Sequence, residues 1–482
     1  MTSIKQASLY VATIVLAIFA IIGVVQLGAS LPAPAAVAGV EQARAHTDAP
    51  STVNAFVQNL TGNLDHPLSH LFIQLLVIIA ACRVIGKLFV RFGLPAVVGE
   101  MCAGILLGPS LFGLVSPDWF AFVFPTESLG TLRLLSQVGI CLFMFTVGMD
   151  LNLDHVRNKA KTAVAVSHAS IVLPFLLGVM LAYFLFTQMA GPKANFLGFA
   201  LFMGISTSIT AFPVLARILQ ERKITRTSLG STAITCAAVD DVTAWTIMAF
   251  VVAIVKASGM IAASFTLVLA LAFIAFMTLV VRPALPVLIG REQLRREEPS
   301  SGTLGIIVCV VLAAALSTEV IGIHALFGSF LAGAVMPDSS EFRRRITTLL
   351  EKFSSVLLLP LFFAFTGLRT EIGLLGGAQD WLICLAIIFV ATLGKLGGSA
   401  IAARVTGMNW RESLQLGALM NTRGLMELIA LNIGYDLGIL SPRIFTMLVI
   451  MAVITTMMTG PLLTLLGVRQ PAIDADHEPS RA

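Results

Sequence analysis

The stretch Ser228–Lys256, SLGSTAITCAAVDDVTAWTIMAFVVAIVK, is long and apolar, yet it carries two adjacent carboxylates, Asp240 and Asp241, near its middle. A helix needs about 20 apolar residues to cross the hydrocarbon core of a bilayer, and this stretch is long enough. An acidic side chain at bilayer depth costs on the order of a few kcal/mol, so such residues usually face a cavity and carry function. The pair therefore predicts a membrane protein that handles protons or cations.

The whole chain has the composition of a protein with many membrane spans. Of its 482 residues, 57% are apolar and 12% are charged, and the mean hydropathy is +0.93. About a quarter of the residues in an ordinary soluble domain are charged. The six cysteines all fall inside apolar runs and form no CxxC pair. They indicate small buried side chains, so we infer no disulfide, no metal-ligand cluster and no cofactor.

Apolar runs predict an all-α polytopic membrane protein with thirteen core transmembrane helices, preceded by one further run over 8–29. The connections are short except for 30–67, 286–302 and 338–352, and we expect no soluble regulatory domain. The predicted core spans are 68–90, 94–114, 128–149, 161–187, 194–219, 227–256, 259–285, 303–319, 321–337, 353–374, 380–404, 411–435 and 441–468.

The positions of the basic residues predict the orientation of the chain. Most of the 31 Lys and Arg lie in alternate loops, which are therefore cytoplasmic. This topology explains the net charge of +5, so nothing calls for a nucleic acid partner. The same pattern predicts that the tail 469–482 is cytoplasmic. Residues 1–30 are either a retained N-terminal transmembrane helix or a signal peptide, since Ala36-Val37-Ala38 resembles a cleavage site, and 31–67 is an extracytoplasmic loop.

Two of the predicted spans carry polar, helix-breaking clusters. Residues 204–213 read GISTSITAFP, in which hydroxyl groups precede Pro213, and residues 417–427 read GALMNTRGLME, which contains Asn421, Arg423 and Glu427. Such clusters are tolerated at bilayer depth where they line a cavity or are covered by protein. A pair of interrupted spans indicates the binding site of a transporter. The alternative is a proline kink in which Ser and Thr bond back to their own helix.

Two further membrane charges are candidates for the site. Lys395 lies deep in its span, where it is expected to pair with a carboxylate or to lose its proton; the alternative is a lysine that extends to the cytoplasmic interface. Glu100 either lines a cytoplasmic funnel or is a structural, hydrogen-bonded acid. Gly104 and Gly108 form a GxxxG step, which predicts close helix packing.

Several of these stretches together resemble the monovalent cation:proton antiporter-2 family, which has a sodium/hydrogen-exchanger-like fold. They are spread over residues 68–468, which is nearly the whole predicted core. Each stretch is weak evidence by itself, and the combination is specific. The matching stretches are FGLP at 92–95 through GPSL at 108–111, TAFPVLARIL at 210–219, VDDV at 239–242, GIHALFGSFLAG at 322–333 and NTRGLMEL at 421–428.

The resemblance implies a fold with inverted repeats and two crossing discontinuous helices. It implies a dimerisation domain, formed by 68–149 and 303–375, and a mobile core ion-transport domain, formed by 161–256 and 380–468. The linker helix between them is 259–285. The protein is then expected to be a homodimer in the cell inner membrane.

The resemblance also implies roles for single residues. Asp241 matches the principal ligand of the cation, Na⁺ or K⁺, and Asp240 matches the acid that pairs with the membrane lysine, here Lys395. Thr207 and Ser208 match the polar lining from the first broken helix. Pro213, Asn421, Arg423, Glu427 and Glu100 stay as candidates for the cavity or for the broken helices.

The function expected from these residues is exchange of a monovalent cation for protons by alternating access, serving pH homeostasis. Electroneutral relatives usually have Asn before the acid, so Asp240 favours an electrogenic exchanger. The alternatives are a cation channel or potassium-efflux protein and a sodium-coupled symporter of an organic anion. The sequence offers neither a phosphate-binding loop nor a nucleophile beside the membrane acids, so we do not expect an enzyme.

Overall fold

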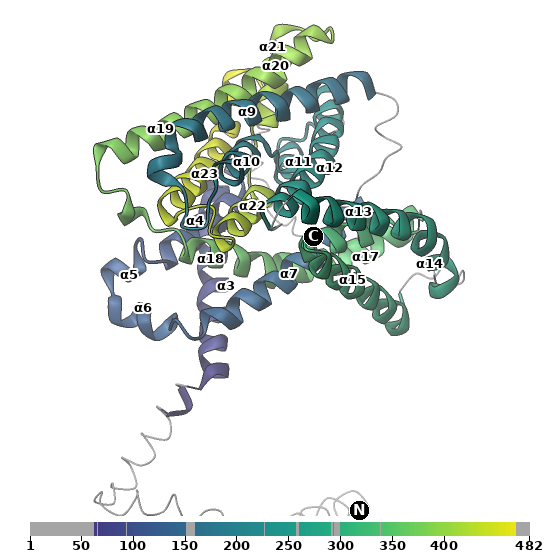
Figure 1. Cartoon of the computed structure of the whole chain (residues 1–482), viewed down its shortest axis with the longest axis horizontal. Coiled ribbons are helices and arrows are strands. Elements are labelled where there is room, and N and C mark those ends of the chain that lie inside the picture. The colour runs from purple at the N-terminus through teal and green to yellow at the C-terminus, as the bar shows by residue number, and fades with distance from the viewer. Residues whose placement is uncertain are drawn as a thin grey trace, which may run out of the picture. The chain divides into compact units, whose positions relative to one another are not determined.

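A computed structural model describes residues 62–468 except 65, 93, 151–159, 226, 257–259, 291–292, 294–298 and 338. The chain from Pro67 onward groups into one compact unit. Its described part consists of helices and connections, with a single β-bridge between Ala190 and Leu440 (Figure 1). The predicted span 8–29, most of the loop 31–67 and the tail 469–482 lie outside the described residues.

All thirteen predicted core spans coincide with helices, which confirms the all-α membrane fold. Ten described helical segments are long and apolar enough to cross a membrane. The other three spans are α16 and the two broken spans. The helices are α3 Pro67–Arg91, α4 Ala96–Leu107, α5 Phe112–Val115, α6 Pro117–Val123, α7 Leu129–Asp150, α9 Ala160–Met189, α10 Phe196–Ser208, α11 Phe212–Glu221, α12 Ser228–Lys256, α13 Met260–Phe276, α14 Arg282–Ile289, α15 Ser301–Ile321, α16 Ala325–Ala334, α17 Ser340–Phe353, α18 Leu359–Leu368, α19 Ala378–Thr392, α20 Gly398–Val405, α21 Trp410–Met420, α22 Leu425–Asp436 and α23 Pro442–Leu465.

Three spans continue through a π-helical turn. These turns are η2 Met277–Val281 between α13 and α14, η3 Ser354–Leu358 between α17 and α18, and η5 Leu393–Gly397 between α19 and α20. Such turns are rare and often occur at functional sites. The long connection predicted over 338–352 is itself largely helical, because α17 runs into α18 through η3.

Small residues bring α4 and α18 into close contact, as the GxxxG step predicted. A Cβ built on Gly108 would lie 2.6 Å from the carbonyl oxygen of Gly367, and one built on Gly104 would overlap the backbone of α18 at Phe363. Only glycine allows two backbones to approach so closely. In lipid, where apolar burial gives little driving force, this contact provides the van der Waals packing that holds the helices together.

The helices around Asp240 and Asp241 pack mainly with one another. α9 lies against α10, α12 and α20, and α12 also contacts α11 and α21. α10 packs beside α22, as Figure 1 shows near the middle of the bundle. These contacts surround the two places where predicted spans are interrupted, so the candidate site lies among buried helices.

Candidate functional site

The first broken span changes from helix to extended chain at the predicted place. α10 ends at Ser208, Ile209 has φ −72° and ψ 136°, and Ala211 has φ −95° and ψ 95°. Pro213 then occupies the first turn of α11. Proline is tolerated there because the N–H that it lacks has no partner within the helix. The interruption therefore leaves the last carbonyls of α10 and the first N–H groups of α11 free for other partners.

The second broken span crosses the first at this interruption. The N–H of Ala211 donates to the carbonyl oxygen of Thr422 over 3.0 Å, which joins the two interruptions. Gly424 lies at the same crossing, where a Cβ would come within 2.9 Å of the Val214 side chain on α11. Two crossing discontinuous helices were predicted, and the structure contains them.

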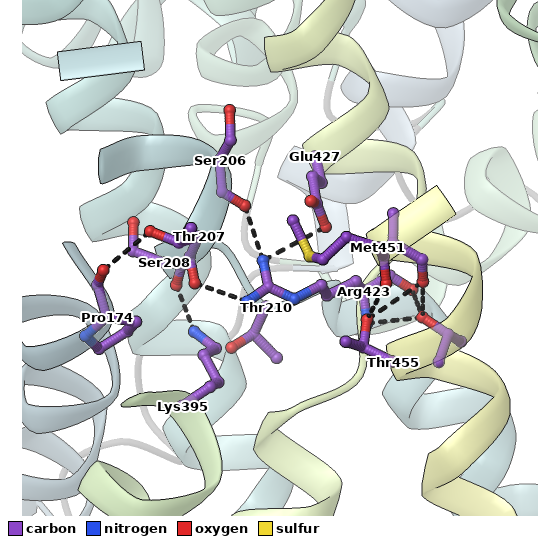
Figure 2. A network of polar contacts seen from close by, with 12 residues as sticks. Pro174, Ser206, Thr207, Ser208, Thr210, Lys395, Arg423, Glu427, Met451 and Thr455 are labelled. Carbon is purple, nitrogen blue, oxygen red and sulfur yellow. Dashed lines mark hydrogen bonds and ion pairs between the residues drawn. The ribbon is translucent and has the colours of Figure 1, made fainter. Parts of the chain in front are cut away.

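Lys395 points into the crossing from the π-helical turn η5 and is fully buried (Figure 2). Its Nζ donates to Oδ2 of Asp240 over 2.9 Å, to the carbonyl of Ser170 over 3.2 Å and to the carbonyl of Ser208. A lysine ammonium has three N–H donors, and each has an acceptor here. The side chain therefore does not extend to the interface, and it pairs with the first acid of the doublet.

Asp240 is enclosed by donors on both carboxylate oxygens. Oδ1 accepts from the Ser167 hydroxyl at 3.1 Å and from the Ser170 hydroxyl at 2.8 Å. Oδ2 accepts from Lys395 and from the Thr210 hydroxyl. A carboxylate offers about four lone-pair positions, so these four donors fill its capacity. Asp240 therefore has no acceptor position left over.

Asp241, the next residue, has different surroundings. It is 3% exposed, and its Oδ1 has no hydrogen-bond partner among the described residues. The backbone N–H of Phe212, at the start of α11, faces its carboxylate as a hydrogen-bond donor. A buried carboxylate with an unfilled oxygen needs a proton or a cation, since burying the bare charge is costly. Its ligand chemistry, hard oxygen, suits an alkali cation.

Arg423 neutralises the carboxyl end of α10. Its guanidinium donates to the carbonyls of Ser206 at 2.7 Å and Thr207 at 2.6 Å, and it forms an ion pair with Glu427 at 3.4 Å (Figure 2). The carboxyl end of a helix carries a partial negative charge, which a cation stabilises. Arg423 and Lys395 together satisfy the carbonyls of three successive residues, Ser206, Thr207 and Ser208.

The structure brings Thr207 and Ser208 to the crossing, but through their backbone rather than their side chains. The Thr207 hydroxyl donates to the carbonyl of Pro174 over 2.8 Å, and the Ser208 hydroxyl donates to that of Ile205 over 3.1 Å. Both hydroxyls are therefore engaged within the helices. Asn421, at the other break, is fully buried, and neither its amide oxygen nor its amide nitrogen has a partner among the described residues.

Glu100 lies outside this cluster of contacts. It is half-buried on α4, its side chain faces α3 at Gly86, and its neighbouring charges are Arg83 and Arg217. The basic residues belong to the ends of α3 and α11 that the charge pattern predicts to be cytoplasmic. This position agrees with an acid near a cytoplasmic entrance, one of the two interpretations left open by the sequence.

Sequence reasoning did not find three residues that touch Asp240: Ser167, Ser170 and Thr210. Ser167 and Ser170 lie three positions apart in an apolar span, which puts both on one face of α9. Two serines at this spacing in an apolar span could have indicated a polar face that contacts a buried group. Thr210 was recognised as part of the hydroxyl-rich stretch but not as a ligand of the acid.

The chain matches the family model described as "Sodium/hydrogen exchanger, transmembrane" over residues 75–468. The chain belongs to the sodium/hydrogen exchanger family. This is a family of membrane transporters, and the match includes both broken spans, the acid doublet and Lys395.

Several relatives of this exchanger have descriptive names. The chain is 43% identical over 390 residues to the Na(+)/H(+) antiporter NhaS4 of Synechocystis sp., covering 81% of this chain and 95% of the relative. It is 39% identical to cation/H(+) antiporter 17 of Arabidopsis thaliana, covering 83% and 48%, and 31% identical to K(+)/H(+) antiporter 1 of Saccharomyces cerevisiae, covering 86% and 47%. The chain thus spans about half the length of these plant and yeast relatives.

A solved structure shares the fold of this exchanger. The sodium proton antiporter MjNhaP1 of Methanocaldococcus jannaschii matches with a TM-score of 0.60 over 83% of this chain and 99% of the other, at 13% sequence identity. The match supports the sodium/proton antiporter-like fold expected from the sequence.

Proposed function

We propose that this chain is a secondary antiporter that exchanges a monovalent cation for protons by alternating access. Asp241 is the carboxylate that holds either the cation or a proton, and competition for this one site couples the two fluxes. The main support for the proposal is the difference in hydrogen bonding between Asp240 and Asp241. Asp240 has all its acceptor positions filled, whereas Asp241 is buried with an unfilled oxygen at the crossing of two broken helices.

The proposed transport cycle uses Lys395 as the carrier of a second proton. Cation binding at Asp241 adds positive charge beside the Lys395–Asp240 pair, which loosens the pair and releases the Lys395 proton. Exchange of one cation for more than one proton makes the antiporter electrogenic.

The proposed motion divides the helices into two groups. A core domain of 161–256 and 380–468 would move against a dimerisation domain of 68–149 and 303–375, with 259–285 as the linker. The pairing of α9 with α10, α12 and α20, and of α4 with α3 and α18, supports this division. We further propose a homodimer in the cell inner membrane with a cytoplasmic C-terminal tail, as the charge pattern and the resemblance imply. The inverted repeat stays a prediction.

The transported cation is proposed to be Na⁺ or K⁺. Relatives are named for both ions, one as a Na(+)/H(+) antiporter and one as a K(+)/H(+) antiporter. The Asp241 carboxylate offers hard oxygen atoms, which suit either ion.

The direct test uses purified protein in proteoliposomes that contain a pH-sensitive dye. An imposed pH gradient is expected to drive uptake of Na⁺ or K⁺ against the cation's own gradient, and addition of the cation is expected to move protons in return. A bulky organic cation serves as the control. If neither ion is accumulated against its gradient, the protein is not an antiporter of these ions, and dissipation of both gradients without coupling would indicate a channel.

A further inference from the structure

An apolar pocket lies where α12, α13 and the start of α16 meet. Its volume is about 460 Å³, including the space at its open mouth. Pockets that take small molecules have volumes of about 300–1,000 Å³. Alanines on α12 and α13 leave this hollow, since larger side chains at the same positions would fill it. The lining includes Ala249, Ala253, Ala270, Leu271, Ile323 and Phe327.

Aromatic side chains hold the inner wall of the pocket in place. The ring of Phe327 lies edge-on to that of Trp245 on α12, with the ring centroids 5.8 Å apart, and Trp245 stacks on Phe330 at 6.1 Å. Thr246 also lines the pocket, but its hydroxyl donates to the carbonyl of Val242 over 2.8 Å, within α12. The wall is therefore apolar and well packed, which suits a hydrocarbon chain better than a polar ligand.

The mouth of the pocket opens on a surface that crosses the bilayer. Phe250 of α12 and Leu271 and Ile274 of α13 line the pocket and are exposed. The segment Ser264–Ile289, which contains most of α13, is apolar and long enough to cross a membrane, and little of it is buried by other helices. Exposed apolar side chains in a spanning segment meet lipid, so a lipid acyl chain is the molecule that can enter this pocket directly.

A lysine lies at the end of the pocket that is nearest the membrane surface. Lys256 is the last residue of α12 and follows Ala253 by three positions, which puts both on one face of the helix. His324, which directly follows the lining residue Ile323, is an electrostatic neighbour of Lys256. Lys256 is exposed and forms no ion pair with another described residue. A lysine at a helix end extends to the headgroup layer, and its ammonium binds phosphate groups.

We propose that this pocket binds one acyl chain of a negatively charged phospholipid, whose phosphate lies beside Lys256. The lipid belongs to the leaflet at the end of α12, which the charge pattern predicts to be extracytoplasmic. Its chain contacts α12, α13 and α16, which belong to the proposed core domain, linker and dimerisation domain. The lipid thereby joins these three parts and stabilises the conformation described here, because a ligand stabilises the state to which it binds.

The position of the chain is tested with phosphatidylglycerol that carries a photoreactive group in its acyl chain, in proteoliposomes of the purified full chain. Mass spectrometry of peptides then compares labelling of 246–253 and 267–274 with labelling of α3, where Leu76 is exposed. We expect the pocket segments to be labelled several-fold more than α3. Ala249→Phe fills the hollow and should remove this excess. Ala272→Phe adds the same ring at an exposed position of α13 outside the lining, and should label like wild type.

The role of Lys256 is tested by thermal unfolding in detergent with added phosphatidylglycerol or phosphatidylcholine. We expect phosphatidylglycerol to raise the melting temperature of wild type by a few degrees more than phosphatidylcholine does. Lys256→Gln should lose this difference, whereas Lys193→Gln, at an exposed lysine away from the pocket lining, should retain it. A lysine can also stabilise the end of its own helix, so the readout is the difference between the two lipids and not the melting temperature itself.

Several results would overturn the proposal. Equal labelling of the pocket segments and α3 in wild type would show that no chain is bound there, as would a second copy of the chain covering this surface. Excess labelling that survives Ala249→Phe, or Ala249→Leu if the first variant is poorly produced, would place the lipid elsewhere. A melting temperature that responds equally to both lipids would refute the phosphate contact with Lys256. Neither measurement uses ion flux, so a failure here is distinct from a failure of the proposed exchange function.

Discussion

Two neighbouring acids on α12 have different chemical surroundings because a helix turns by about 100° per residue. One side of the turn presents Asp240 to Lys395 and the α9 serines, and the other presents Asp241 to the start of α11. A buried ion pair is stable when every donor and acceptor has a partner, whereas a buried oxygen without a hydrogen-bond partner is costly. The different roles of Asp240 and Asp241 in the proposed cycle follow from this difference in their surroundings.

The Lys395→Gln variant is expected to retain cation/proton exchange but to lose net charge movement, because glutamine cannot release a proton. Lys395→Arg is the matched variant: it retains the positive charge beside Asp240, but a guanidinium does not deprotonate in proteins. Both variants should therefore exchange without net charge on a solid-supported membrane. Charge movement like that of wild type in either variant would show that Lys395 is not the second proton carrier.

At the scale of elements, the site depends on two broken helices that meet through their backbones. The hydrogen bond from Ala211 to Thr422 and the close approach at Gly424 leave no room for a larger residue. Arg423 then ties the end of α10 to the start of α22. Each of these contacts gives a prediction about geometry or stability.

Gly424→Val is expected to push α11 away from the crossing, since its Cβ alone would lie 2.9 Å from Val214. Transport per molecule of purified protein should fall at least tenfold, because a displacement near 1 Å at a catalytic or transport site can cost about that much or more. Gly305→Val is the control, since a Cβ on Gly305 meets nothing within 4 Å. Equal rates in the two variants would show that the crossing tolerates the shift.

Arg423→Met should destabilise the protein because it leaves Glu427 and two carbonyls of α10 without their cation. Breaking a buried pair in this way costs about 3–5 kcal/mol. Arg443→Met is a suitable comparison: its ion pair with Asp380, at 3.7 Å, has an arginine that is 47% exposed, and such pairs contribute about 1 kcal/mol or less. Thermal unfolding in detergent should separate the two variants clearly. A similar melting temperature for both would contradict the structural role of Arg423.

At the scale of the whole molecule, a second charged cluster joins the proposed domains at the side predicted to be extracytoplasmic. Asp436, at the end of α22, pairs with Arg369 at 2.8 Å and with Arg133 of α7 at 3.1 Å. Arg369 also donates to Asn432 and stacks over Phe365. Asp436 and Asn432 belong to the proposed core domain, whereas both arginines belong to the proposed dimerisation domain. We expect these ion pairs to hold the outer side closed.

Asp436→Asn is therefore expected to open the outer side. The readout is the labelling rate of Ser136→Cys by a membrane-impermeant thiol reagent, because Ser136 is 1% exposed and lines a small cavity beside Asp436. Labelling should rise several-fold with Asp436→Asn and stay low with Asp436→Glu, which retains the negative charge. No difference between the two variants would mean that these pairs do not control access.

Much of the fold and of the site could be predicted from the sequence, because the apolar bilayer restricts which residues a spanning segment can contain. The spans followed from apolar length, and the breaks at 209–211 and 421–424 followed from proline, glycine and hydroxyl clusters inside them. Asp240, Asp241 and Lys395 stood out because charges are rare at bilayer depth.

The remaining features depend on contacts between distant segments. The α9 serines reach Asp240 across some seventy positions of sequence, 73 for Ser167 and 70 for Ser170, and no local pattern gives that register. The use of backbone carbonyls rather than hydroxyls at Thr207 and Ser208 depends on the rotation of α10 against its neighbours. Residues 1–61 and 469–482 lie outside the described part, so the sequence-based expectations for them remain predictions.

The most direct measurement compares Asp241→Asn with Asp240→Asn in proteoliposomes, with cation-driven proton flux as the readout. Asparagine at 241 cannot carry a proton or balance a cation, so flux should vanish. Asparagine at 240 leaves Asp241 intact, so exchange should persist with its charge movement lost. Cation-driven proton flux that survives Asp241→Asn would contradict the account.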